Sequence, residues 1–201
     1  MRVKILSKLL FNEFEQLALK LKGIKLLGQC PDNILAQCLV IGEHLSVSIM
    51  QQILLAQQTA MKNKKIKVIE PYDYFEASSN FLNAKINIKK SQKNFSTLAI
   101  EDADIWLMAG FSAADKNNKV VTLGRNGSDY SATCLATCLQ ACSCEIWTDV
   151  SGVYTVDPNL IKEAQLLKHL SYSEALELSY FGASILHPKT IEPIASCKIP
   201  C

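Results

Sequence analysis

The segment Thr122–Tyr130, which reads T-L-G-R-N-G-S-D-Y, combines residue types suited to binding a small anionic molecule. Its two glycines allow the backbone to turn tightly and to approach a ligand closely. Arg125 carries a planar guanidinium that fits a carboxylate or a phosphate. Ser128 or Asp129 is expected to cap a helix running to about residue 141, and the first N–H groups of a helix favour an anion. An ordinary strand-to-helix turn explains the same letters, and the G-K-[ST] ending of a Walker A loop is missing.

A second segment, W-T-D-V-S-G-V-Y-T-V-D-P, follows the expected strand Cys144–Trp147. Ligands of open α/β sheets bind beyond the carboxyl ends of the strands, where Thr148 and Asp149 lie. Tyr154 offers a ring for stacking or a hydroxyl for hydrogen bonding. Asp157, followed by proline, favours a turn. A structured hairpin without a ligand is the alternative interpretation.

Two further segments carry polar residues but indicate less. Phe181–Thr190, F-G-A-S-I-L-H-P-K-T, is typical of a corner between two helices, in which His187 bonds to the backbone. In Ile41–Ser46, I-G-E-H-L-S, Glu43 stands beside a histidine on an expected helix, where such a residue usually faces solvent.

The elements that must position these residues follow from hydrophobic periodicity and from breaker residues. Strands are expected at residues 65–70, 84–88, 104–109, 119–123 and 144–147, with another beginning at residue 198. Helices are expected at residues 7–22, 31–57 (as two helices broken near Gly42), 89–98, 173–180 and 188–196, beside the helix that starts at residue 128 or 129. Strands alternating with helices predict a mostly parallel sheet covered on both faces, in one domain spanning residues 1–201.

The composition indicates a globular protein. The chain has 201 residues and a formal net charge of +2, which argues against a nucleic-acid partner. No stretch is expected to span a membrane or to act as a signal peptide, so a cytoplasmic location is expected. Cys134, Cys138 and Cys142 recur on one helix face, where packing is favoured over metal binding. All eight cysteines are expected to be reduced thiols.

Taken together, the motifs resemble the catalytic domain of the aspartokinases, which have the amino-acid kinase fold. The resemblance covers about Phe11 to Cys201 and is to the bifunctional aspartokinase–homoserine dehydrogenase type. The matching segments are G-Q-C-P-D, G-E-H-L-S, M-A-G-F, L-G-R-N-G-S-D-Y, E-I-W-T-D-V, G-V-Y-T-V-D-P, E-L-S-Y-F-G-A and L-H-P-K-T. The resemblance implies a three-layer α/β/α (carbamate kinase-like) fold with a mostly parallel central sheet.

The resemblance also implies a reaction, in which ATP, with Mg²⁺, phosphorylates the β-carboxylate of L-aspartate to give 4-phospho-L-aspartate. This is the first step of lysine, threonine and methionine biosynthesis. Glu43, Arg125, Ser128 and Asp129 are then expected to bind aspartate, with Asp129 also organising the reacting groups. Thr148, Asp149, Tyr154 and Asp157 are expected to bind the nucleotide, and no residue is assigned to a metal.

Three departures from the family concern cations near the phosphates. The family's opening strand, which ends in K-F-G-G-T-S, has no counterpart here, and Asn159 and Ser184 stand where the family has Arg and Lys. The regulatory ACT and dehydrogenase domains are also not expected. The alternatives are therefore a catalytically impaired or split-gene chain that keeps the aspartate pocket for binding or oligomerisation, and an enzyme completed by a second chain that supplies the N-terminal strand.

Overall fold

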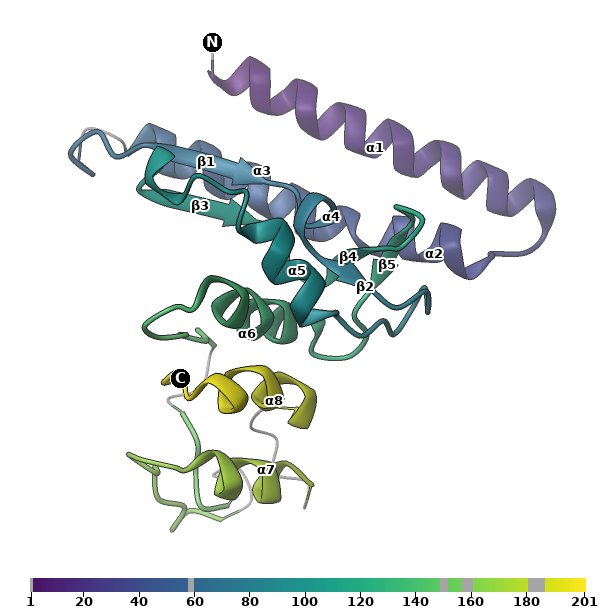
Figure 1. Ribbon diagram of the computed structural model, residues 1–201. Coiled ribbons are helices and arrows are strands. Elements are labelled where there is room, and N and C mark those ends of the chain that lie inside the picture. The colour runs from purple at the N-terminus through teal and green to yellow at the C-terminus, as the bar shows by residue number, and fades with distance from the viewer. Residues whose placement is uncertain (1, 58–59, 149–151, 157–160, 181–186) are drawn as a thin grey trace. The chain divides into compact units, whose positions relative to one another are not determined.

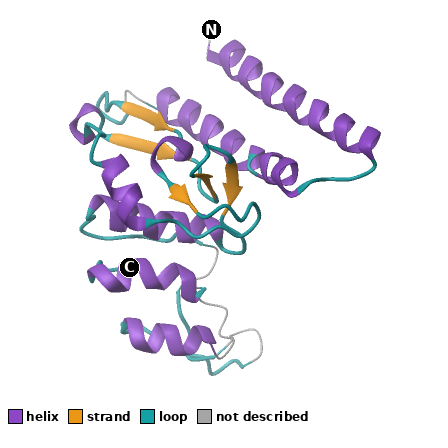
Figure 2. Cartoon of the chain, turned by 45° about the vertical axis from the view of Figure 1, so that its right-hand side comes forward, coloured by secondary structure: helices purple, strands orange, loops and turns teal. Residues whose placement is uncertain are grey.

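The computed structural model describes residues 2–57, 60–148, 152–156, 161–180 and 187–201 (Figure 1). The chain forms two compact units, Met1–Arg125 and Asn126–Cys201. Among the described residues, all the strands belong to the first unit, as the orange arrows of Figure 2 show.

Three helices open the first unit: α1 (Arg2–Leu27), α2 (Asp32–Leu39) and α3 (Ile41–Ala56). Helix α1 packs along α3, and Leu10, Leu17 and Ile24 are half-buried on one face of α1. These positions recur every seven residues, which is the spacing of a narrow helix–helix seam. The predicted break between the second and third helices is confirmed, although it falls at Val40 rather than at Gly42.

The predicted α/β class is confirmed, but the strands form two small sheets. Strand β1 (Ile66–Ile69) pairs in parallel with β3 (Ile105–Met108), and α3 packs against both. The second sheet has the order β2–β4–β5, with strands Glu76–Ala77, Ser112–Asp115 and Val120–Thr122. In it β2 and β4 are parallel, whereas β4 and β5 are antiparallel because only the short turn after Asp115 connects them.

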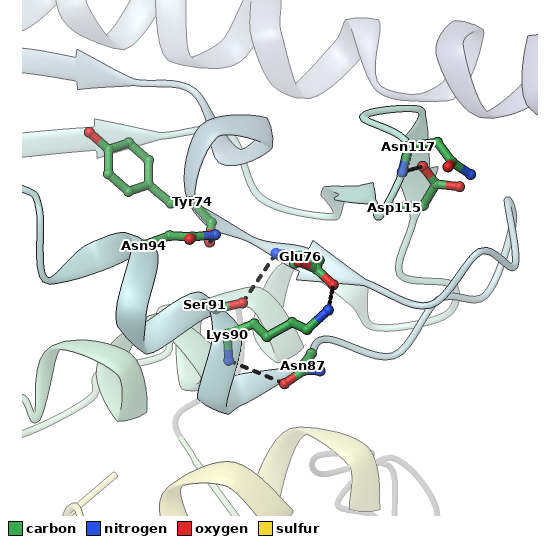
Figure 3. A network of polar contacts seen from close by, with 8 residues as sticks. All are labelled: Tyr74, Glu76, Asn87, Lys90, Ser91, Asn94, Asp115 and Asn117. Carbon is green, nitrogen blue, oxygen red and sulfur yellow. Dashed lines mark hydrogen bonds and ion pairs between the residues drawn. The ribbon is translucent and has the colours of Figure 1, made fainter.

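Short helices join these strands and close the core of the first unit. They are α4 (Pro71–Tyr74), α5 (Ile88–Phe95) and the 3₁₀ turn η1 (Ile100–Asp102). The ring of Phe95 stacks on Tyr74 at 4.8 Å and meets the edge of Phe75 at 5.2 Å. Polar contacts hold α5 on β2 (Figure 3): Lys90 Nζ pairs with the Glu76 carboxylate at 2.5 Å, and Ser91 Oγ accepts the Glu76 N–H at 3.2 Å.

The second unit contains α6 (Gly127–Leu139), α7 (Tyr172–Tyr180) and α8 (Pro188–Cys197). Helices α6 and α8 pack together over a small core made by Ala136, Cys144, Ile194 and Ile199. Pro188 occupies the first turn of α8, where its missing N–H costs nothing.

Three expected strands do not form. Residues 144–147 and 198–201 have no regular structure, and a backbone hydrogen bond of 2.8 Å from the Cys144 N–H to the Pro200 oxygen joins them. Residues 84–88 contribute only the isolated bridge between Ala77 and Ile86. A strand is defined by its ladder of partners, and periodicity in one segment cannot show whether that ladder forms.

The stretch Asp32–Ala56, which comprises α2 and α3, is long and apolar enough to cross a membrane by length and composition. No such stretch was expected from the sequence. Core helices of globular proteins also meet this criterion, but they are mostly buried, whereas 11% of the window is buried here. Here α2 packs on β5 and α3 on β1, with Ala36 and Ile41 buried, so both helices belong to the packing of the first unit.

Candidate functional site

The turn that follows β5 is held from both sides. The Thr122 N–H donates to the Phe81 oxygen at 2.7 Å and the Thr122 oxygen accepts the Ala84 N–H at 2.8 Å, while the Leu123 N–H donates to the Phe111 oxygen at 2.9 Å. Thr122 and Leu123 are buried. The chain therefore leaves the sheet from a fixed point, and the exposed Arg125 follows at once.

Gly124 makes this exit possible. Its φ is +76°, and a Cβ added there would lie 2.5 Å from the side-chain oxygen of Asn83. The second tight position is Asn126, with φ 56°, whereas Gly127 is the first residue of α6. The predicted glycine turn is thus confirmed at Gly124 but not at Gly127, because asparagine tolerates the left-handed conformation.

The start of α6 differs from the prediction. Neither Ser128 nor Asp129 caps the helix, because Asn126 is the N-cap residue and makes no side-chain capping bond. Ser128 is exposed and Asp129 is half-buried, both in the first turn. Ser131 Oγ donates to the Ser128 oxygen at 2.7 Å, which stabilises this turn. A helix N-terminus carrying an exposed hydroxyl can bind an anionic ligand through its free N–H groups.

Glu43 lies in the first turn of α3 and is half-buried, so the solvent-facing interpretation is only partly met. The neighbouring His44 fixes this turn: its Nε2 lies 2.8 Å from the Tyr72 hydroxyl. Burial raises the pKa of Tyr72 to about 12, against a smaller lowering by the hydroxyl of Ser112. Tyr72 therefore remains a neutral phenol at physiological pH.

The residues expected to bind the nucleotide are partly described. Thr148 is exposed, directly after the irregular segment that contains Cys144. Tyr154 is half-buried, and its backbone forms an isolated antiparallel β-bridge with Leu166. Around this bridge the Thr155 N–H donates to Gln165 at 2.9 Å, as in the hairpin interpretation. Two of the expected residues, Asp149 and Asp157, lie outside the described residues.

Of the remaining motif, Phe181–Thr190, residues 181–186 lie outside the described residues, and only its last four residues can be compared with the predicted helix corner. His187 is the N-cap of α8, and its Nδ1 accepts the Lys189 N–H at 3.2 Å. An open hollow of about 690 Å³ lies between α7 and α8, lined by Leu176, Ser179, His187, Pro188, Lys189 and Glu192. None of the expected site residues lines it, so the turn after β5, which presents the exposed Arg125, is the better candidate.

The aspartate set is divided between the units by position in the chain. Glu43 and Arg125 belong to the first unit, and Ser128 and Asp129 to the second. Across the parts of the chain that the structure describes, no three His, Cys, Asp or Glu side chains gather to hold a metal ion.

Sequence reasoning missed three residues that shape this region: Asn83, Tyr72 and Phe111. Phe111 has φ +64°, a conformation that a bulky residue adopts only when its surroundings hold it there. The only local signal near it was Gly110, at which the strand beginning at residue 104 was expected to end. Tyr72 and Asn83 reach the region through tertiary contacts, which no local pattern shows.

The fold agrees with what comparison with known proteins shows. Residues 8–201 match the Amino acid kinase family, and the chain belongs to that family. The chain is 51% identical over 98% of its length to the bifunctional aspartokinase/homoserine dehydrogenase of Buchnera aphidicola subsp. Acyrthosiphon pisum, and covers 24% of that protein. It is 43% identical to the corresponding protein of Haemophilus influenzae, over 94% of the chain and 23% of the relative.

Solved structures give the same result for the fold. E. coli aspartokinase III in complex with lysine and aspartate matches with a TM-score of 0.76 and 25% identity, over 99% of this chain and 46% of that one. The same enzyme in complex with aspartate and ADP matches with a TM-score of 0.79 and 24% identity, over 95% and 42%. The chain thus spans less than half the length of these proteins.

Proposed function

We propose that this chain carries aspartate kinase chemistry, the ATP-dependent phosphorylation of the β-carboxylate of L-aspartate to 4-phospho-L-aspartate. The observation that carries the proposal is the anchored turn that presents Arg125, in a chain 51% identical to an aspartokinase-containing protein. The related E. coli aspartokinase III, at 25% identity, was crystallised with aspartate. We also propose a cytoplasmic location, as expected from the sequence.

The substrate supplies its own nucleophile. A β-carboxylate is ionised near neutral pH and needs no general base. One of its oxygens forms a bond to the γ-phosphorus of ATP while the bond from that phosphorus to the bridging oxygen breaks, and ADP leaves. The task of the protein is then positioning and charge stabilisation.

Each residue of the aspartate set has a role that suits its charge. Arg125 pairs through its guanidinium fork with a carboxylate of the substrate. Glu43 and Asp129 place negative charge toward the ammonium group, and Ser128 offers a hydroxyl at the start of α6. We propose that the nucleotide is bound by four residues that the family resemblance implies: Thr148, Asp149, Tyr154 and Asp157.

Mg²⁺ in phosphoryl transfer neutralises phosphate charge. Phosphate oxygens of ATP and water molecules supply several of its ligands. The described side chains offer no cluster of three donors for it. No residue is therefore assigned to the ion, and the roles above do not depend on one.

An ADP-release assay with ATP, Mg²⁺ and aspartate tests the proposal. Arg125→Ala should raise the KM for aspartate about 10- to 100-fold, the value of one or two charge-assisted hydrogen bonds. Arg125→Lys should recover only part of this, because an ammonium group lacks the fork. Lys116→Ala, which removes an exposed cation from the turn after β4, is the matched control and should change nothing. A rise in the KM for ATP alone would contradict the role of Arg125.

A second candidate function is binding of aspartate with little or no turnover. Asn159 and Ser184 favour it, because both replace cations that the family resemblance places near ATP. Calorimetry would then show heat for aspartate but not for ATP. The double variant Asn159→Arg with Ser184→Lys should raise kcat in that case, by up to about 10³-fold if a restored cation stabilises the transferring phosphoryl group. An unmodified chain that already turns over at about 1 s⁻¹ or faster, the usual range for kinases, excludes this alternative.

A further inference from the structure

Two cysteines that are far apart in the sequence meet in the second unit. The Cys144 N–H donates to the Pro200 oxygen at 2.8 Å, which brings residue 144 alongside residues 200 and 201. Both residues are free cysteines, and a side-chain interaction with the other cysteine is the first cause of the pKa shift of each. Two cysteines on neighbouring backbone segments can form a disulfide when their Cα atoms lie within about 7 Å of each other.

The two thiols differ in accessibility and in acidity. Cys201 is exposed, whereas Cys144 is only 7% exposed. The hydrogen bond from Cys144 lowers the pKa of Cys201 below the usual thiol value, and the same bond together with burial raises the pKa of Cys144. Cys201 is therefore the thiol that solvent can reach and that ionises first. This division of roles is that of an attacking and a resolving cysteine.

The segment that carries Cys201 is held in place. The Tyr172 hydroxyl donates to the Ile199 oxygen, and the Ile199 N–H donates to the Ile194 oxygen at 3.1 Å. The Ile199 side chain is buried against Ala136 in the core of the unit. Because these contacts fix the backbone that carries Cys201, its approach to Cys144 costs less entropy than an encounter between free segments.

We propose that Cys144 and Cys201 form a thiol–disulfide switch that reacts with low-molecular-weight disulfides. The thiolate of Cys201 attacks one sulfur of the small disulfide, the bond between its two sulfurs breaks, and one small thiolate leaves and takes up a proton. Cys144 then loses its proton to solvent and attacks the sulfur of Cys201, which releases the second small thiol. Two protein thiols are oxidised, and one disulfide is reduced to two thiols.

The switch lies next to a residue with a role in the proposed function. The charge of Asp129 is a minor cause that raises the pKa of both Cys144 and Cys201. The disulfide would replace two ionisable groups beside Asp129 by a neutral bridge and would fix residues 198–201 to residue 144. This consequence for substrate binding, unlike the chemistry of the thiols, rests on the proposed function.

Other thiols of the unit serve as internal controls. Cys138 is 8% exposed, and burial raises its pKa to about 12, which keeps it protonated. Its electrostatic neighbour Cys197 is exposed on α8. Cys142 is also exposed and lies two residues from Cys144.

The test is incubation of the whole chain with oxidised glutathione, followed by digestion without reduction and mass spectrometry. We expect loss of two free thiols per chain and a cross-link that fragment spectra assign to Cys144 and Cys201. Cys201→Ser should abolish the cross-link, and Cys144→Ser should trap glutathione on Cys201. Cys197→Ser, the matched control, should leave the cross-link unchanged.

Two results would overturn the switch. One is a cross-link from Cys201 to Cys142 or Cys138. The other is glutathione that stays bound to Cys201 in the chain without any substitution. Circular dichroism of each variant shows whether it folds. The reactivity of Cys201 with iodoacetamide in the otherwise unmodified chain, expected to exceed that of Cys197 at neutral pH, is a measurement that needs no variant. None of these readouts requires kinase activity, so failure of the proposed function leaves the test of the switch intact.

Discussion

Two single residues hold the backbone near the candidate site. One is a glycine, which leaves room for a neighbouring side chain, and the other is an aspartate whose carboxylate accepts two backbone hydrogen bonds. Gly124 leaves the space that the Asn83 side chain occupies. Asp115 is 2% exposed, and its carboxylate accepts the N–H groups of Asn117 at 2.8 Å and Lys119 at 2.9 Å, which closes the turn between β4 and β5 (Figure 3). Both residues act on the sheet from which the chain runs to Arg125.

Gly124→Ala should destabilise the first unit by about 1–3 kcal/mol, because alanine at φ +76° is strained and its Cβ would overlap Asn83. Urea denaturation measures the change. Gly23→Ala is the matched control: Gly23 lies inside α1 with no atom within 4 Å of an added Cβ, so it should gain about 0.5–1 kcal/mol. Equal midpoints for the two variants would show that Gly124 is not strained.

Asp115→Asn should lower stability at pH 7 by roughly 1.5–3 kcal/mol, since two charge-assisted hydrogen bonds weaken. Those bonds lower the pKa of Asp115 from its ordinary value of 3.8. A lowered pKa contributes stability above the ordinary value, and this contribution is lost as the pH falls below 3.8 toward the folded value. The stability difference between the two proteins should therefore shrink as the pH falls from about 4 through the lowered pKa of the folded protein. A constant difference would contradict this account.

Elements in this chain often end on residues that are not glycine. Helix α6 ends at Gln140 with φ 52°, and α8 ends at Lys198 with φ 55°, both in the left-handed region. Each conformation costs a residue with a side chain about 1–2 kcal/mol. The ends of these two helices are held by the core that they share.

Gln140→Gly should stabilise the second unit by about 1 kcal/mol, because glycine adopts the left-handed conformation without the cost. Thermal or urea unfolding followed by circular dichroism measures this. Ala136→Gly, four residues earlier in the same helix, should instead be destabilising by about 1 kcal/mol or more. If both variants lose stability, the end of α6 does not behave as a left-handed cap.

The elements that the sequence predicted are those whose pattern is local. Strands β1 and β3 and helices α5 to α8 were expected near their observed positions, because apolar periodicity and flanking breakers define them. Strand β4, S-A-A-D, was missed because its burial depends on neighbours rather than on its own apolar content. The turn at Gly124 was predictable from residue types, but the meeting of Cys144 with Cys201 was not, because nothing local links those positions.

At the scale of the whole chain, the structure exposes much apolar surface. Leu19, Leu26 and Leu27 on α1 are 62%, 78% and 68% exposed. Contiguous exposed apolar surface is typical of interaction sites or of proteins that aggregate. Apolar periodicity predicts a helix at residues 7–22 but cannot show which of its apolar residues meet α3.

The chain should self-associate as its concentration rises, because α1 carries these leucines in solvent. Sedimentation velocity measures the average mass across a dilution series. The double variant Leu19→Lys with Leu26→Lys should reduce the association. Ile161→Lys, at a 46% exposed position of the second unit, is the control and should have little effect. A mass that is constant over the series would contradict the expectation.

The two tryptophans of the sequence fall one in each unit. Trp106 is half-buried, with its Nε1 donating to the Ile100 oxygen at 3.1 Å, so its fluorescence should shift to longer wavelength when the first unit unfolds. Trp147 is 89% exposed and already emits from water. It stands directly before Thr148, so a nucleotide bound there should quench it or shift it to shorter wavelength. The Trp147→Phe variant therefore isolates an optical signal of folding, and the Trp106→Phe variant isolates an optical signal of occupancy.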